Sequence, residues 1–161
     1  MLFRSEICTY GEFNMIAYLN KPEANAETVK YGWLHTGDIG YMDEDGYVYI
    51  VDRKKDMINR GGENIYPREI EIVIESHPKV GEVAVIGIPD KHLGERVKAF
   101  VVPRPSENLT EDEIKEFLKD KVAKYKVPEF VEVTGNIPRN PTGKILKQEL
   151  KKMEQAKARN A

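Results

Sequence analysis

Only one cysteine, Cys8, and three histidines occur among the 161 residues of the chain. One cysteine cannot form a disulfide within its own chain, and no cysteines and histidines stand at spacings typical of a metal site. His35, His77 and His92 therefore read as ordinary surface or boundary residues. These scarcities predict a protein without a metal site that works in a reducing compartment, the cytoplasm.

Long hydrophobic runs are also missing. None approaches the roughly 20 apolar residues that a membrane-spanning helix needs. The opening segment, MLFRSEICTYGE, lacks the apolar core of a secretory signal peptide, so we expect no such peptide. With 40% hydrophobic and 32% charged residues, the composition is that of a globular domain and not of a disordered chain.

The net charge of −2 hides a step along the chain. Residues 1–52 hold three basic against nine acidic residues, a balance of −6, and residues 53–161 hold 22 against 18, a balance of +4. A step of this kind is typical of a domain boundary, and a basic segment favours anionic ligands. Ordinary surface charge explains the same numbers, so charge alone predicts no nucleic-acid partner.

The first third of the chain has a mainly β pattern. A short helix is expected at Ala24–Val29, and a strand at Trp33–Thr36 that a turn at Gly37-Asp38 closes. Asp43–Gly46 is a typical hairpin corner before a strand at Tyr47–Val51. About 50 residues of this kind bury too little surface to form an independent domain, so this part reads as the end of a larger one.

From residue 57 onward the pattern predicts a compact α+β domain with the order hairpin, helix, strand, strand, helix, strand, helix. Pro67 opens the first helix, and Thr110 caps the second with Glu113 at the capping-box position. The remaining expected elements are strands at 82–88, 97–102 and 130–133, an amphipathic helix from Ile145 to Met153, and a frayed tail at 155–161.

Four stretches carry residues suited to chemistry. They are GWLHTGDIG at 32–40, DRKKDMINRGGEN at 52–64, IYPREIE at 65–71 and PRNPTGKIL at 138–146. In this order they resemble the C-terminal part of the acyl-CoA synthetases of the fatty-acid–CoA ligase type. These belong to the adenylate-forming superfamily, with firefly luciferase and peptide-synthetase adenylation domains. The segment GEFNMIAYLNKPEA at 11–24 is similar to the strand-rich region that precedes the first motif.

The resemblance implies an architecture. Residues 1–52 correspond to the β-rich tail end of a large N-terminal domain, residues 53–56 to a hinge, and residues 57–154 to a small α+β lid domain with a short sheet, a hairpin and helices. Lys55 stands at the family's hinge position, where the lid domain rotates between two half-reactions. A polar, exposed residue suits a hinge, although an ordinary linker has the same composition.

Two residues are expected to hold the nucleotide. Taken alone, Asp38 reads as a turn aspartate that caps its own backbone, and Arg53 as a solvated surface arginine. The resemblance implies that Asp38 accepts hydrogen bonds from the ribose hydroxyls of ATP and acyl-adenylate, because a carboxylate offers two acceptor oxygens. It implies that Arg53 contacts the nucleotide near the ribose, where its fork of donors suits hydroxyls and phosphate.

Lys144 is the expected catalytic residue. The resemblance implies that its ammonium bridges the substrate carboxylate and the α-phosphate, where a fixed cation stabilises developing charge. Gly61 and Gly62 correspond to a loop that faces coenzyme A, since glycine permits close backbone approach. By themselves they indicate only a turn. Arg60 beside them could face a phosphate of coenzyme A, although a solvent-facing arginine is the favoured interpretation. Lys147 reads as one more lysine of a basic tail.

The implied reaction has two steps. A carboxylic acid and ATP give an acyl-adenylate and pyrophosphate with the help of Mg²⁺, and the acyl group then passes to coenzyme A with release of AMP. The phosphate-binding loop and the acyl pocket of the family are absent from this sequence. ATP, AMP, coenzyme A and Mg²⁺ are therefore expected to bind through a large domain outside it, and the chain alone to lack ligase activity. The acyl chain length stays open, as does the choice between coenzyme A and a carrier protein.

Two other functions remain open. The chain could be a non-catalytic subunit that docks on a partner carrying the large domain. It could also be a self-associating module, because unpaired strand edges invite pairing with a second copy.

Overall fold

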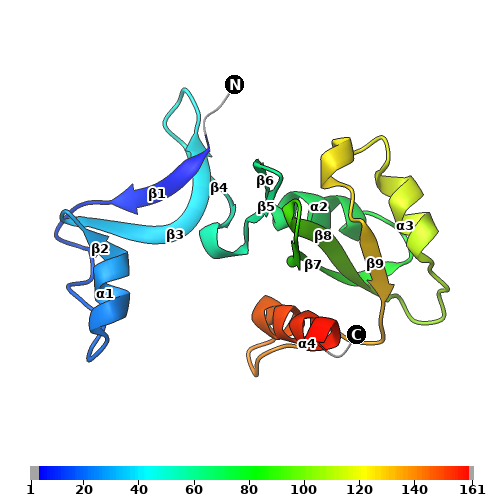
Figure 1. Ribbon diagram of the computed structural model, residues 1–161. Coiled ribbons are helices and arrows are strands. Elements are labelled where there is room, and N and C mark those ends of the chain that lie inside the picture. The colour runs from blue at the N-terminus through cyan, green and yellow to red at the C-terminus, as the bar shows by residue number, and fades with distance from the viewer. Residues whose placement is uncertain (1–3, 160–161) are drawn as a thin grey trace. The chain divides into compact units, whose positions relative to one another are not determined.

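The computed structural model describes residues 4–159 and divides into two compact units, one ending at Lys55 and one beginning at Asp56 (Figure 1). Each unit is described by itself. The two units together contain four α-helices, a four-stranded sheet and a five-stranded sheet, so the predicted α+β class is confirmed. Within the described residues, no helix has the length and apolarity to cross a membrane.

The N-terminal unit is an antiparallel sheet with β3 (Trp33–Met42) at its centre. β1 (Ser5–Thr9), β2 (Val29–Lys30) and β4 (Val48–Arg53) each pair with β3. The short helix α1 (Pro22–Thr28) begins with a proline in its first turn, close to the predicted range.

The predicted turn at Gly37-Asp38 is wrong. β3 continues through this pair to Met42, although Gly37 has a φ of +73°. The reason is tertiary: β1 and β4 pair with β3 on its two sides and hold this segment extended. The turn at Asp43–Gly46 is confirmed, since the Gly46 amide donates to the Asp43 carbonyl at 3.2 Å and Gly46 has a φ of +85°.

The N-terminal unit has almost no core. Among its described residues, 4–55, only Ile39 and Gly40 are buried. Many large apolar side chains are exposed instead, and they include Tyr10, Phe13, Ile16, Tyr18, Leu19, Tyr31, Trp33, Met42, Tyr47 and Ile50. Exposed apolar surface on this scale is typical of a face that another polypeptide segment covers.

The C-terminal unit is built on the long hairpin of β7 (Val80–Asp90) and β8 (Gly94–Pro103). β9 (Phe130–Val133) adds to β8 in parallel, and the small hairpin of β5 (Ile58–Arg60) and β6 (Glu63–Ile65) attaches to β8 near Gly94. These strands confirm the three predicted ones and the predicted hairpin, and β7 and β8 are longer than expected.

Helices cover both faces of this sheet (Figure 1). Side chains alternate along β7 and β8: Val83 and Val85 join the cluster with α2 (Pro67–Glu75) and α3 (Glu111–Leu118), whereas Ala84 and Ile86 join the cluster with Leu150. Leu150 belongs to α4 (Lys147–Arg159), which packs against the opposite face. The hairpin is therefore buried on two sides.

The helix ends follow local signals. α2 has its proline in the first turn, and the Thr110 hydroxyl accepts from the Glu113 amide at 3.2 Å, so both predicted starts are confirmed. A 3-10 turn, η2 (Lys124–Lys126), precedes β9. α4 starts at Lys147, later than predicted, and remains helical through Arg159, beyond the point where fraying is expected. Residues 160 and 161 lie outside the described residues.

Truncation of Ile74 to alanine should lower the free energy of unfolding by about 2–5 kcal/mol, because its fully buried side chain fills the cluster between α2 and the sheet. Ile72 on the same helix is 53% exposed, so Ile72→Ala should change stability by only about 0.5 kcal/mol. Denaturant unfolding of the two variants measures the difference. Equal losses would contradict the assigned core face of α2.

Candidate functional site

The β3–β4 hairpin brings Asp38 and Arg53 together. They are cross-strand partners in the register, and Arg53 Nη1 donates to Asp38 Oδ1 at 2.6 Å. The Asp38 amide donates to the Thr36 hydroxyl at 3.1 Å, and that hydroxyl donates to the Ile7 carbonyl at 2.8 Å. Two residues that the sequence assigned separately to a nucleotide thus form one carboxylate–guanidinium pair, which orients the carboxylate before any ligand binds.

The segment after β4 is a 3-10 turn, η1 (Lys54–Asp56), and contains Lys55. Lys54 Nζ donates to Glu6 Oε2 on β1 at 2.7 Å. The hydrogen bonds from Lys54 and His35 hold the pKa of the Glu6 carboxyl below its usual range. Lys54 therefore belongs to the N-terminal unit, and the exposed Lys55 is the last residue before the C-terminal unit begins.

Gly61 and Gly62 form the two-residue turn between β5 and β6. Their φ angles are +60° and +90°, the left-handed values that a type I′ hairpin requires at both positions. The Gly61 amide donates to the Leu93 carbonyl at 2.7 Å, so the turn is tied to the β7–β8 connection. The prediction that Arg60 faces solvent is wrong. Its Nη2 pairs with Glu129 Oε1 at 2.6 Å, and its side chain is only 25% exposed.

Lys144 lies on an exposed loop before α4, and not in the helix itself. Asn140 organises this loop: its Oδ1 accepts from the Lys144 amide at 2.8 Å and from the Thr142 amide at 3.1 Å. The backbone amide of Asn140 donates in turn to the backbone carbonyl of Lys144 at 2.9 Å. Within residues 4–159 the Lys144 ammonium has no hydrogen bond or ion pair. The backbone is thus braced while the cationic end remains available.

Lys147, which the sequence placed among ordinary tail lysines, has a structural partner. Its Nζ lies 2.7 Å from Glu71 Oε1, and its side chain is only 17% exposed. Glu71 is buried on α2, and the same oxygen accepts from the Val85 amide of β7 at 2.9 Å. This pair joins the start of α4 to α2 and the sheet, directly after the loop that carries Lys144. Separation in the sequence hid it from pattern analysis.

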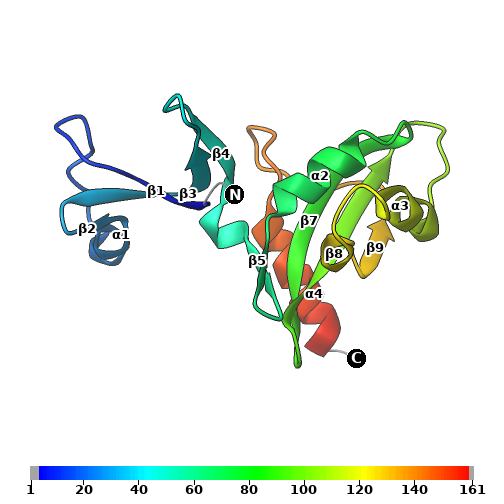
Figure 2. The ribbon, with the colours of Figure 1, turned by 90° about the horizontal axis from the view of Figure 1, so that it is seen from above.

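The two loops of the C-terminal unit are far from one another within that unit. Figures 1 and 2 both show the orange loop before α4 and the turn between β5 and β6 at different ends. The unit has a closed core, so the two loops hold fixed positions relative to each other within it.

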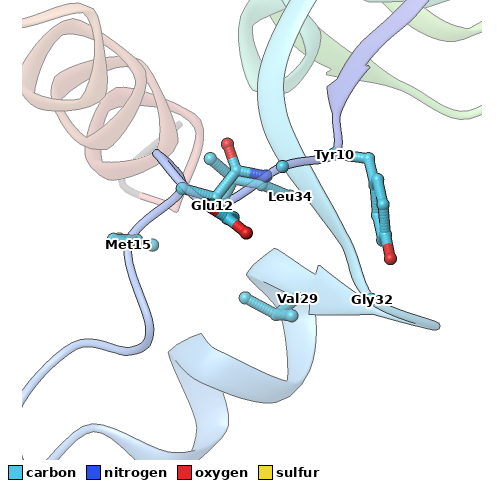
Figure 3. A pocket seen from close by; sticks show the side chains of 8 residues that line it. Tyr10, Glu12, Met15, Val29, Gly32 and Leu34 are labelled. Carbon is cyan, nitrogen blue, oxygen red and sulfur yellow. The ribbon is translucent and has the colours of Figure 1, made fainter.

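A separate recess of about 440 Å³ lies in the N-terminal unit (Figure 3). Tyr10, Glu12, Met15, Val29 and Leu34 line it, between the start of β3, α1 and the segment after β1. None of the sequence-predicted site residues contributes to it. Tyr10, one of the exposed apolar side chains of this unit, lines the recess, so the recess belongs with that exposed apolar surface and not with the candidate site.

Comparisons with known proteins agree with this arrangement. Residues 69–144 match the profile of the AMP-binding enzyme C-terminal domain. The chain is 48% identical over 146 residues to a fatty acid–[acyl-carrier-protein] ligase of Streptomyces coeruleorubidus, covering 91% of this chain and 28% of that protein. It is 46% identical over 155 residues to a long-chain-fatty-acid–CoA ligase of Escherichia coli, covering 96% of this chain and 28% of the relative.

A solved structure with the same fold is that of o-succinylbenzoate CoA synthetase from Bacillus subtilis in complex with its acyl-adenylate intermediate. The TM-score is 0.84 at 40% sequence identity, over 92% of this chain and 30% of that chain. The present sequence therefore spans less than a third of the length of the proteins that it matches.

Replacing Asn140 with alanine should loosen the loop that carries Lys144. Loss of the Oδ1 acceptor should raise hydrogen exchange at the Thr142 and Lys144 amides by about fivefold, the equivalent of a hydrogen bond worth ~1 kcal/mol. Asn140→Asp keeps an acceptor oxygen and should retain protection, and Asn136→Ala, at an exposed site, is a matched control. Unchanged exchange in Asn140→Ala, measured by NMR, would contradict the bracing role.

Proposed function

Because this chain belongs, through residues 69–144, to the family of AMP-binding enzyme C-terminal domains, we propose that it acts as the C-terminal part of an ATP-dependent acid–thiol ligase. The proposed enzyme converts a carboxylic acid, of the fatty-acid class, into an acyl-adenylate and then a thioester. The observation that carries this proposal is the braced loop that presents the ammonium of Lys144 outward.

In the first half-reaction, a carboxylate oxygen attacks the α-phosphorus of ATP and pyrophosphate leaves. Both reacting groups are anionic, so a cation between them lowers their repulsion and stabilises the charge that develops on the phosphoryl oxygens. Lys144 supplies this cation. Its backbone amide and carbonyl are both bonded to Asn140, so little reorganisation is needed when the substrates arrive.

Asp38 and Arg53 serve the nucleotide. The Asp38 carboxylate accepts hydrogen bonds from the ribose hydroxyls, and it keeps acceptor capacity beyond the one contact from Arg53 Nη1. Arg53 orients the carboxylate and offers further donors toward the ribose. Both residues are in the N-terminal unit, so nucleotide contacts remain with that unit while the other one moves.

The proposed pivot for rotation of the C-terminal unit is Lys55, directly after Lys54. Lys54 is tied to Glu6 on β1, whereas Lys55 is exposed and directly precedes the C-terminal unit. Rotation at Lys55 would exchange the Lys144 loop for the Gly61-Gly62 turn at the nucleotide site. In the second half-reaction a thiol sulfur attacks the acyl carbonyl carbon, AMP leaves, and the glycine turn lets the thiol-bearing arm approach the backbone closely.

The acceptor is a thiol in either case that the relatives represent. One relative is named for an acyl-carrier protein and another for CoA. We propose coenzyme A as the acceptor, with a carrier protein as the alternative that the same glycine turn would also accommodate.

Magnesium is expected to act through residues outside this chain. Within residues 4–159, the one group of three His, Cys, Asp or Glu side chains with ligand atoms close together is Glu6, Cys8 and His35. Thiol and imidazole donors do not suit Mg²⁺, which prefers an all-oxygen octahedral set. No step of the reaction is therefore assigned to Mg²⁺ here.

The central test uses a chimera in which this chain replaces the matching C-terminal part of the Escherichia coli relative. Lys144→Ala in the chimera should lower acyl-adenylate formation by about 10²–10³-fold, the effect of removing one such charge-stabilising contact. Thioester formation from supplied acyl-adenylate should be preserved, because that step uses the other loop. Pyrophosphate release and thioester production measure the two steps.

Lys152→Ala is the matched control, since Lys152 is an exposed lysine on α4 that pairs with Glu149 at the helix surface. Equal loss of both steps in Lys144→Ala, or no loss in either, would refute the assignment of Lys144 to adenylation.

The 161-residue polypeptide by itself should form no detectable acyl-adenylate from ATP and a fatty acid, because catalysis needs both faces of the site. One observation supports the alternative, a non-catalytic module that docks on a partner: the N-terminal unit has many exposed apolar side chains. Sedimentation of the polypeptide by itself, and again after mixing with the large domain of a relative, separates the two alternatives. A larger species in the first sample indicates self-association, and one that forms only in the mixture indicates docking. Adenylate formation by the isolated polypeptide would overturn the proposal.

A further inference from the structure

Glu6, Cys8 and His35 form a cluster in the N-terminal unit that the proposed reaction does not use. Cys8 on β1 and His35 on β3 are partners in the strand register. Cys8 Sγ lies 3.4 Å from His35 Nδ1, which lies 3.0 Å from Glu6 Oε2. The three side chains are partly buried, and their ligand atoms all lie within 4.8 Å of one another.

The geometry is not that of a proton relay. In a Cys–His–carboxylate relay the two partners use different ring nitrogens of the histidine. Here the thiol and the carboxylate both approach Nδ1, which offers at most one proton to the two of them. Three donor atoms that all lie within 4.8 Å of one another are instead an arrangement that one cation can bridge.

The distances suit a tetrahedral ion. With metal bonds of about 2.3 Å to sulfur and 2.0–2.2 Å to nitrogen and oxygen, two ligands of one zinc ion lie roughly 3.3–3.6 Å apart. The Sγ–Nδ1 distance of 3.4 Å lies in this range, and the Nδ1–Oε2 distance of 3.0 Å is slightly short. A thiolate with an imidazole selects zinc-class metals and disfavours magnesium and calcium.

Charge around the cluster is favourable apart from one residue. Residues 1–52 carry a net charge of −6, which favours a cationic ligand over an anionic one. Lys54 opposes a metal ion because its Nζ occupies Glu6 Oε2 at 2.7 Å. The Lys54 side chain is 58% exposed, so it can turn into solvent without leaving a buried charge.

We infer that Glu6, Cys8 and His35 form a binding site for Zn²⁺ with three protein ligands and one water. Cys8 releases its thiol proton to solvent on binding, and Zn²⁺ displaces Lys54 from Glu6. The ion is a ligand of this unit and is distinct from any Mg²⁺ of the proposed reaction.

Cobalt titration of the tag-free 161-residue chain tests this inference. Cys8 is the single cysteine, so a thiolate-to-cobalt charge-transfer band reports this residue alone. We expect that band together with the visible bands of tetrahedral Co²⁺, and displacement of Co²⁺ by Zn²⁺ at one equivalent. X-ray absorption of the zinc form should show one sulfur and three nitrogen or oxygen neighbours.

Variants identify the ligands. Cys8→Ser should abolish the charge-transfer band, and His35→Gln and Glu6→Gln should each weaken Zn²⁺ binding by at least about tenfold. Lys54→Met should tighten it by about two- to fivefold, because a competing cation is removed. His92→Gln, at an exposed histidine of the other unit, is the matched control, and circular dichroism checks the fold of each variant.

Absence of the thiolate band from the unmodified chain at saturating Co²⁺ would overturn the inference, whatever the variants do. So would a zinc shell without sulfur, or binding that is unchanged in folded His35→Gln and Glu6→Gln.

Discussion

The pairing of β3 with β1 on one side and β4 on the other determines which polar side chains of the N-terminal unit meet. Against β4, Asp38 lies opposite Arg53, and against β1, His35 lies opposite Cys8. A shift of one residue in either ladder would turn the side chains of the shifted strand to the other face of the sheet. The proposed nucleotide contacts and the proposed zinc ligands therefore depend on one set of strand registers.

The C-terminal unit depends on a different constraint, the burial of β7 and β8 on both faces. Helices α2 and α3 cover one face and α4 the other, so α4 has a defined position relative to the sheet. Glu71 strengthens this arrangement, because one carboxylate oxygen contacts both the Val85 amide and Lys147. Burying an unpaired carboxylate lowers the stability of the fold, so the pairing with Lys147 is favourable. It also holds the start of α4, which directly follows the loop that carries Lys144.

The two units differ in how completely they bury apolar surface. The second has two clusters of buried side chains, whereas in the described part of the first only Ile39 and Gly40 are buried. The second therefore has the close packing of a rigid body. The first resembles a sheet that is completed by other protein, which agrees with the length of the relatives, of which this chain matches less than a third.

Elements with local signals were predictable from the amino-acid sequence. Pro67 and Thr110 mark helix starts, Gly61-Gly62 marks a tight hairpin, and short apolar runs mark β7 and β8. Caps, left-handed φ angles and apolar runs of this length are signals that lie within a few residues. The order of four motifs was also sufficient to indicate the family, which the comparisons bear out.

Features that depend on residues distant in the chain could not be predicted in this way and became visible in the folded arrangement. Pairing on both sides of β3 replaced the turn expected at Gly37-Asp38, and a buried glutamate gave Lys147 a role that a row of lysines does not reveal. Cys8 and His35 met because strands β1 and β3 are antiparallel neighbours. The sequence specifies the type of each side chain. Its burial and its partners depend on packing and strand register, which involve the whole sheet.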